Sequence, residues 1–197
     1  MKQIQDQKPE ALADGRRERI KKAALKVFAK RGLQAAKMSM IAEEAGVSQG
    51  LSYRYFSSKE ELFAILVQEA LEEAQASLED ISRLTGSPKE QLRAFTLTML
   101  DESHKSYFML LRYAQIEEGV PEKTNQMLKS YSPDRTMGQL IPLFLQGQQA
   151  GEFSEGEPDE LLFFYFSVIT GLMLQDVPGN YGEWQNEVDR LMKLILK

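Results

Sequence analysis

Apolar residues recur at spacings of three and four along almost the whole chain, which is the period of an amphipathic α-helix. The first stripe runs from Ile20 to Phe28, with Arg and Lys on the opposite face. It predicts a helix that starts near Asp14 and ends at Gly32, because glycine commonly terminates helices. Residues 1–13 are polar and are expected to form a flexible N-terminus. No run of β-branched residues alternates between turn signals, so the predicted class is all-α.

Two short helices and a long one follow this first helix. Apolar spacing predicts the short helices over 38–45 and 49–56, joined by a turn that begins with Gly46. Ser58 and Glu61 have the spacing of a capping box, in which serine accepts from the N3 amide and glutamate accepts from the cap amide. They predict the start of the long helix.

Proline and glycine divide the rest of the chain. Ser87, Pro88 and Glu90 suit the N-cap, N1 and N3 positions, and they predict a helix that continues to a break at 119–121. Similar signals predict a break at 132–133 and then a helix that runs to Gly151 with a kink at Pro142. An apolar helix is predicted over 158–175. A turn over 178–182 and a last amphipathic helix that ends near Leu196 follow it.

The two short helices have the spacing of a helix-turn-helix motif. The second helix of such a motif fits the DNA major groove. Gly50 costs about 1 kcal/mol relative to alanine inside a helix, and a close approach of the backbone to base edges would explain that cost. Tyr53, Arg54, Tyr55 and Phe56 are too many large side chains for one small core face, so some of their polar tips are expected to bind phosphate.

The charge of the chain is distributed unevenly. The net charge is −5, yet residues 1–67 carry 13 Lys and Arg against 8 Asp and Glu, whereas residues 68–197 have a net charge of −10. A basic N-terminal part on an acidic body is typical of a nucleic-acid reader with a separate regulatory part. From charge alone, a solvated face of the first helix explains the basic residues equally well.

The segment from Ile41 to Leu62, IAEEAGVSQGLSYRYFSSKEEL, resembles the DNA-binding signature of the TetR family of bacterial transcriptional regulators. The matching frame is I-A-x-x-A-G-V-S-x-G-x-x-Y-x-Y-F-x-x-K-E-x-L. Upstream, Ala23, Phe28 and Gly32 also lie where that family has its first helix.

The resemblance implies a helix-turn-helix DNA-binding domain over 14–57 and a linking helix over 58–84. An effector-binding and dimerisation domain would occupy 85–197. It also implies a homodimer on a near-palindromic, double-stranded operator, with recognition helices roughly 34–36 Å apart.

Position by position, the resemblance places Gln49 and Gly50 where the family contacts base edges. Lys37 stands where the family has a capping Thr or Ser: either Lys37 supplies charge to the same phosphate, or Ser39 caps a helix that starts two residues later. The apolar stripe favours the first register. Ser52 replaces an apolar residue, so its hydroxyl must find a backbone partner. The predicted DNA-binding residues are Lys37, Ser39, Ser48, Gln49, Gly50, Tyr53, Arg54, Tyr55 and Lys59.

Composition excludes several chemistries. With no cysteine and one histidine, disulfides and cysteine or histidine-cluster metal sites are excluded, and no metal or cofactor is predicted. Asp101, Ser103 and His104 are near in sequence, but adjacent helical residues point apart, so no catalytic role is predicted. The longest apolar run, 161–166, is too short for a membrane helix, and 1–8 has no signal-peptide core. A cytoplasmic protein with no membrane partner is expected.

Methionine and aromatic residues are concentrated in the second part of the chain. At helical spacing such stripes are usually core, but the resemblance implies that some of them enclose an apolar effector pocket with a few polar groups. The candidate pocket residues are Phe95, Met99, His104, Phe108, Arg112, Gln115, Met137 and Phe144.

The segment 161–174 is apolar on nearly every side, so it must be buried all round. Either a second subunit covers one of its faces, or it is the central core helix of a monomer. The predicted dimer interface combines it with the final helix, through Phe164, Val168, Gly171, Leu172, Trp184, Val188, Leu191 and Ile195.

Together these features predict a homodimeric transcriptional repressor that a small hydrophobic effector releases from its operator. The alternative is a TetR-like adaptor that regulates through a protein partner without binding DNA. An enzyme is not predicted, because one histidine, no cysteine and no facing carboxylates leave few catalytic groups.

Overall fold

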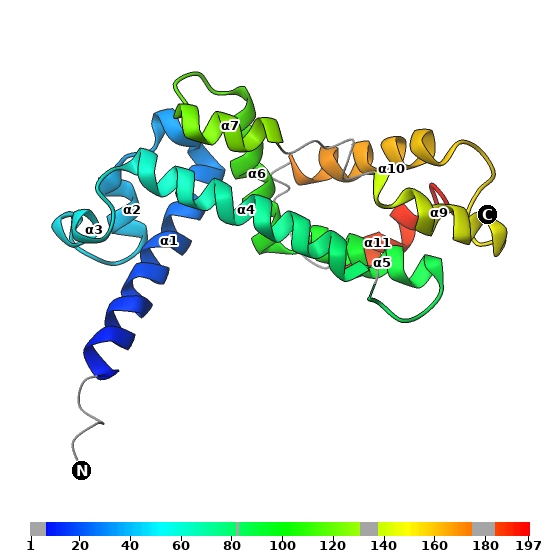
Figure 1. Ribbon diagram of the computed structural model, residues 1–197, viewed down its shortest axis with the longest axis horizontal. Coiled ribbons are helices and arrows are strands. Elements are labelled where there is room, and N and C mark those ends of the chain that lie inside the picture. Colours follow the sequence, from blue (N-terminus) through cyan, green and yellow to red (C-terminus); the bar gives the residue numbers. More distant parts are fainter. Residues whose placement is uncertain (1–6, 82, 131–137, 175–183) are drawn as a thin grey trace, which may run out of the picture. The chain divides into compact units, whose positions relative to one another are not determined.

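The computed structural model describes residues 7–81, 83–130, 138–174 and 184–197. These residues form helices joined by short connections (Figure 1), and the predicted all-α class is confirmed. Within the described ranges, none of the helices is long and apolar enough to cross a bilayer. The helices are α1 (Gln7–Ala35), α2 (Met38–Glu44), α3 (Gln49–Tyr55), α4 (Lys59–Ile81), α5 (Pro88–Met99), α6 (Glu102–Ile116), α7 (Glu122–Ser130), α9 (Ile141–Gln149), α10 (Pro158–Met173) and α11 (Trp184–Met192).

The chain divides into two units. The first unit contains residues 1–70 and 106–128, which include α1 to α3, the start of α4, most of α6 and α7. The second unit contains residues 71–105 and 129–197, which include the rest of α4, α5 and α9 to α11.

The core of the first unit forms around α1. Phe28 of α1 and Phe63 of α4 are fully buried and meet edge to face, with ring centroids 5.1 Å apart. α2 packs on α1, and α3 packs on α2. Lys21 of α1 is almost buried, and although burial disfavours its charge, hydrogen bonds to Glu69 and Glu18 raise its pKa. The charged pair therefore joins α1 to α4 beside the aromatic contact.

α1 starts earlier than its apolar stripe predicts, at Gln7 rather than near Asp14. The extra residues are mostly good helix formers, and Pro9 lies in the first turn, where proline is tolerated. The expected flexible segment 1–13 is therefore helical from residue 7 onward. At its other end, the helix is interrupted at Gly32, which has φ 70° and ψ −179°.

Glycine at position 32 is favoured for two physical reasons. Its positive φ strains any residue with a side chain. A Cβ at this position would also overlap the carboxylate of Glu117, which accepts a hydrogen bond of 2.7 Å from the Leu33 N–H. The predicted end of the apolar stripe at Gly32 is thus confirmed as a sharp break in α1.

The helix predicted from Pro88 to the break at 119–121 is wrong in one respect, because it is two helices. α5 ends at Met99, and the Asp101 carbonyl accepts the first bond of α6, from the Lys105 N–H at 2.9 Å. Asp101 is thus the N-cap of α6, a position that aspartate favours. The start of α5 is as predicted, with a complete capping box between Ser87 and Glu90.

The helix predicted to run through Pro142 to Gly151 is described only from residue 138 onward. There α9 begins at Ile141, and Pro142 lies in its first turn, where the missing N–H of proline costs no helical hydrogen bond. One prediction about the last helix is wrong. α11 ends at Met192, short of the predicted end near Leu196. The final residues pair instead with the segment after α9, where the Ser154 N–H donates to the Ile195 carbonyl at 2.8 Å. The predicted turn over 178–182 lies outside the described residues.

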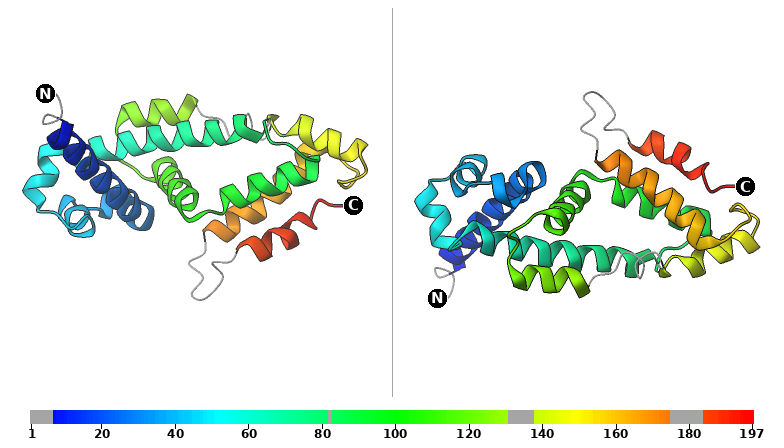
Figure 2. Two further views of the ribbon diagram at one scale, coloured as in Figure 1. Left: turned by 90° about the horizontal axis from the view of Figure 1, so that it is seen from below. Right: turned by 90° about the horizontal axis from the view of Figure 1, so that it is seen from above.

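Tyr165 is at the centre of the second unit, where α10 and α11 lie side by side (Figure 2). Its hydroxyl is 2.8 Å from the Thr96 hydroxyl of α5 and donates to the Met192 sulfur of α11 at 3.3 Å. Burial raises the pKa of Tyr165 to about 12, against a partial opposing effect of the hydrogen bond with Thr96. One buried phenol therefore connects three helices.

Gly32→Ala is expected to destabilise the protein more than Gly46→Ala. Both glycines have positive φ, which costs roughly 1–2 kcal/mol with a side chain. Only at Gly32 does the added methyl also displace Glu117 from the Leu33 N–H, a charged hydrogen bond worth roughly 1.5–3 kcal/mol. Urea unfolding of the two variants measures the difference, and equal losses would contradict the role given to Glu117.

Tyr165→Phe is expected to reduce the loss of unfolding free energy that accompanies a rise in pH above about 10. Between about pH 10 and 12 the unfolded phenol ionises while the buried phenol stays neutral, so the wild type loses roughly 2–3 kcal/mol across this window. The variant lacks this contribution. Unfolding free energies measured at pH 9 and pH 11.5 test this, and parallel pH profiles of the two proteins would refute it.

Candidate nucleic-acid interface

The start of α2 settles which of the two predicted registers is correct. Lys37 has an extended backbone, with φ −130° and ψ 147°, and makes no side-chain cap bond. Its carbonyl accepts from the Met40 and Ile41 N–H groups at 3.0 and 3.2 Å, so Lys37 is the N-cap and the first register is confirmed. Ser39 lies in the first turn of α2 and is exposed, as is Lys37 itself.

The turn between α2 and α3 is a Schellman motif. Gly46 has φ 61°, its N–H donates to the Glu43 carbonyl at 3.0 Å, and the Val47 N–H donates to the Ala42 carbonyl at 2.9 Å. Ser48 then caps α3, because its hydroxyl oxygen accepts from the Leu51 N–H at 3.2 Å. The predicted glycine turn and serine cap are both confirmed, and they fix the angle between the two helices.

One face of α3 is anchored in the core. Ser52 is fully buried, and its hydroxyl donates to the Ser48 carbonyl at 3.5 Å, which is the backbone partner that the sequence required. Phe56, just after the helix, is also buried, and the guanidinium of Arg17 lies 5.2 Å from its ring centroid. These contacts hold α3 by its C-terminal half.

The other face of α3 is open to solvent. Gln49, Gly50, Tyr53 and Arg54 are exposed, and Tyr55 is half-buried. Gln49 and Tyr53 are one turn apart, as are Gly50 and Arg54, so the four residues form one continuous surface. A Cβ placed on Gly50 would have no neighbour within 4 Å. Packing within the protein therefore does not explain a glycine at this position.

A cleft of about 300 Å³ lies where the start of α2, α3 and the start of α4 meet. Ser58 caps α4 by accepting from the Glu61 N–H at 3.0 Å. Glu61 folds back over the start of α4, as the predicted capping box requires: its carboxylate accepts from the hydroxyl and N–H of Ser57 and also interacts with the backbone N–H of the cap residue Ser58. These two bonds from Ser57 lower the pKa of Glu61. The cleft is lined by Ala36, Lys37, Met38, Tyr53, Ser57, Ser58, Lys59 and Glu60.

Lys59 lines this cleft, but its ammonium group is turned toward the end of α1. It donates to the carbonyl oxygens of Leu33, Gln34 and Ala36 at 2.8, 3.3 and 2.9 Å. These bonds differ from the phosphate contact that the resemblance implies for Lys59.

Glu117 and Glu118 also contribute to this region, and sequence reasoning missed both. The Leu33 N–H donates to Glu117, and the Gln34 side-chain amide donates to the Glu118 carbonyl at 2.7 Å. Each contact joins residues 84 positions apart, so no local pattern could indicate it. The predicted helix end at Gly32 was the available signal in the sequence, and it did not indicate which residues would contact this turn.

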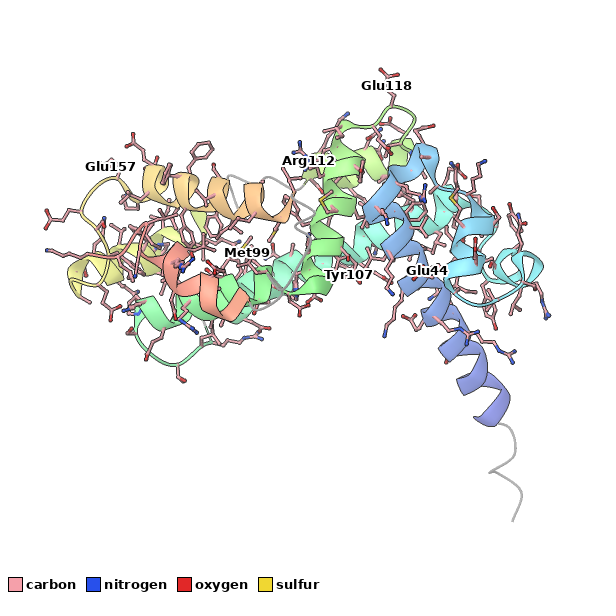
Figure 3. The ribbon with its side chains drawn as sticks, turned by 180° about the vertical axis from the view of Figure 1, so that it is seen from behind. Glu44, Met99, Tyr107, Arg112, Glu118 and Glu157 are labelled. Atoms are coloured by element: carbon pink, nitrogen blue, oxygen red, sulfur yellow. The ribbon has the colours of Figure 1, made fainter. Side chains whose placement is uncertain are left out.

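The candidate effector residues are divided between the two units. In the second unit, Phe95 and Phe144 are buried, and Met99 and His104 are half-buried. His104 has Nε2 3.4 Å from a Glu73 oxygen and Nδ1 3.7 Å from an Asp101 oxygen. In the first unit, Phe108 is half-buried, whereas Gln115 and Arg112, which Figure 3 labels, are exposed. Met137 lies outside the described residues.

α10 has two different faces within one chain. Leu162, Tyr165, Ile169 and Met173 are buried, but Phe163 and Phe164 are 63% and 55% exposed. The expectation that this helix is buried on every side is therefore not met by a single subunit. Of the predicted interface residues, Phe164 and Gly171 are exposed, and Val168 and Leu172 are half-buried.

Three of the residues predicted for the dimer interface at the end of the chain are already covered within a single chain. Val188 and Ile195 are fully buried and Leu191 nearly so, because the apolar face of α11 packs on α5 of the same chain. These three residues belong to the core of the second unit. The side chain of Trp184 lies outside the described side chains.

Comparison with known proteins agrees with this geometry. Residues 20–66 match the family described as bacterial regulatory proteins, tetR family. The chain is 38% identical over 166 residues to the HTH-type transcriptional regulator YfiR of Bacillus subtilis, covering 83% of this chain and 80% of that protein. It is 29% identical over 149 residues to the HTH-type transcriptional repressor NicS of Pseudomonas putida, covering 73% and 68%.

A solved structure shares the fold. The ketosteroid transcriptional regulator KstR2 of Mycobacterium tuberculosis aligns with a TM-score of 0.67 and 23% identity, covering 92% of this chain and 95% of that one. The helix-turn-helix geometry, the matched segment and the similarity to YfiR over most of both chains lead to one conclusion: the chain belongs to the TetR family of bacterial regulatory proteins and is a helix-turn-helix transcriptional regulator.

Proposed function

We propose that this regulator is a repressor that binds a near-palindromic operator as a homodimer and leaves it when a small hydrophobic effector binds. Residues 14–57 are the proposed DNA-binding domain, 58–84 the linking helix and 85–197 the effector-binding and dimerisation domain. Repression is proposed because the relative NicS is named as a repressor.

The observation that carries DNA binding is the exposed face of α3. Gly50 lies on this face in the first turn of α3 with open space around it, so packing within the protein does not account for a glycine there. Close approach of the α3 backbone to base edges accounts for it, with Gln49 beside it as the base-reading side chain. Lys37, Ser39, Ser48, Tyr53, Arg54 and Tyr55 are the proposed phosphate contacts around it.

The observation that supports a homodimer is the outer face of α10. Phe163 and Phe164 together with Gly171 present an apolar surface that water would otherwise cover. A second copy of α10 buries such a surface symmetrically and places two α3 helices on one operator.

The effector is proposed to be small and hydrophobic, with Phe95 and Met99 of α5 among the residues that contact it. Methionine and aromatic side chains form adaptable apolar walls. The name of KstR2 as a ketosteroid regulator is consistent with apolar ligands in this fold.

Fluorescence anisotropy tests this function. The labelled duplex is the DNA upstream of the gene that encodes this protein, compared with a shuffled duplex at two salt concentrations. Tight binding that prefers the native sequence, with two subunits per site, is the expected result. Equal weak binding to both duplexes would contradict it and would favour the adaptor that acts through a protein partner.

Gly50→Ala is expected to stabilise the protein and weaken DNA binding at the same time. The methyl group adds about 0.5–1 kcal/mol to the free energy of unfolding, because α3 gains helix propensity. It separates the backbone from the bases and lowers affinity roughly tenfold. Gly15→Ala in α1 is the matched control, since it also has open space, and it should gain stability without losing affinity. Undiminished affinity of Gly50→Ala would refute the base contact.

Phe164→Glu is expected to raise the dimer dissociation constant roughly 30-fold or more, because it places a charge in an apolar interface. Sedimentation velocity across a concentration series measures this change. Leu145→Glu on α9 is the control, because Leu145 is also an exposed apolar residue, 42% accessible, and lies outside the proposed interface. If both variants dimerise like the wild type, α10 is not the interface.

A further inference from the structure

We infer that Lys59 and Glu117 are positioning residues of the DNA-binding site, and that Lys37 supplies the cation that contacts phosphate from the cleft between α2 and α4. Lys59 and Glu117 act through Leu33, which they bind from opposite sides. This inference rests on the proposed DNA-binding function.

The ammonium group of Lys59 is saturated by the protein itself. A lysine has three N–H donors, and the carbonyls of Leu33, Gln34 and Ala36 accept all three at 2.8 to 3.3 Å. These three carbonyls follow the break at Gly32, so they need hydrogen-bond donors from elsewhere in the protein. A phosphate contact would require Lys59 to abandon these bonds.

Glu117 binds the same residue from the other side. Its carboxylate accepts from the Leu33 N–H at 2.7 Å, the short distance of a charge-assisted hydrogen bond. Leu33 is almost fully buried, so both of its backbone groups depend on these partners. Glu117 and Lys59 thus bind the two peptide groups that flank the Leu33 Cα. We name these residues the Lys59–Leu33–Glu117 cluster.

The cluster controls the segment that leads into α2. Only Gly32 allows the chain to turn here, and Ala36, whose carbonyl Lys59 also binds, directly precedes Lys37. The cluster therefore fixes where α2 begins and where Lys37 and Ser39 face DNA. Glu117 lies at the end of α6, so that helix end belongs to the positioning machinery of the DNA-binding site.

Lys37 is placed differently from Lys59. It is exposed and lines the cleft beside Tyr53 and Ser57. Among the described residues, no carboxylate pairs with its ammonium group. Its charge is thus available to a phosphate, and the position that departs from the family pattern takes over the role expected of Lys59.

The salt dependence of DNA binding separates the two lysines. Each phosphate contact contributes about 0.9 to the slope of log affinity against log salt concentration. Lys37→Met should lower the slope by about 0.9 for each bound subunit. Lys59→Met should leave the slope unchanged while lowering affinity roughly threefold to tenfold on every operator, because the surface is misplaced. A slope that falls for Lys59→Met and stays constant for Lys37→Met would overturn the assignment.

Glu117→Gln and Glu118→Gln form a matched pair for the other half of the cluster. Each removes one negative charge, so their long-range effects on DNA are equal, but the Glu118 side chain is exposed at the tip of the α6–α7 connection (Figure 3). At a temperature where circular dichroism shows both variants fully folded, Glu117→Gln should bind every operator roughly threefold to tenfold more weakly than Glu118→Gln. A merely stabilising role would leave the two affinities equal, and that result would refute positioning.

Amide hydrogen exchange provides a readout without DNA. The Leu33 N–H should be protected in the wild type and in Glu118→Gln, and should exchange at least tenfold faster in Glu117→Gln. Equal exchange in all three proteins would overturn the cluster. If the wild type bound no DNA, the proposed function would fail, whereas this exchange result would still decide whether the cluster exists.

Discussion

The first unit depends on how α1 ends. Helix propensity and apolar spacing favour continuation of α1, yet the chain must turn sharply to begin α2. The positive φ of Gly32 breaks the helix and exposes backbone groups in a region where Leu33 and Ala36 are almost inaccessible to water. Buried backbone groups without partners are costly, so the turn is possible only with donors and acceptors from elsewhere. Lys59 and Glu117 provide them, from α4 and from the end of α6.

The same constraint explains how a helix as short as α3 can present a defined surface. A helix of this length is unstable alone, because nucleation outweighs the few hydrogen bonds it gains. The Schellman turn at Gly46, the cap at Ser48 and the buried Ser52 and Phe56 fix it from one side. Its opposite side needs no packing, so Gln49, Gly50, Tyr53 and Arg54 are left for a partner.

The second unit is organised around a buried polar side chain. Its buried phenol, Tyr165, connects α5, α10 and α11, while α11 contributes Val188, Leu191 and Met192 to the same core. α10 carries more apolar side chains than this core covers. Phe163 and Phe164 remain exposed on its outer face, where the proposed partner subunit would bury them.

The sequence by itself determined the helical class, the helix-turn-helix motif, the cap at Ser48, the capping box at Ser87 and the family. These features depend on local spacing and on residues a few positions apart, and periodicity reports such relations directly. The sequence did not predict the helix boundaries at Asp101 and near Pro142, because a single aspartate or a single proline is compatible with more than one local structure. Only the tertiary structure decided that Lys59 binds carbonyls of α1, that Glu117 occupies the space beside Gly32, and that Val188, Leu191 and Ile195 are core residues of one chain. Each of these contacts joins residues far apart in the sequence, and their proximity is a consequence of packing that no local pattern encodes.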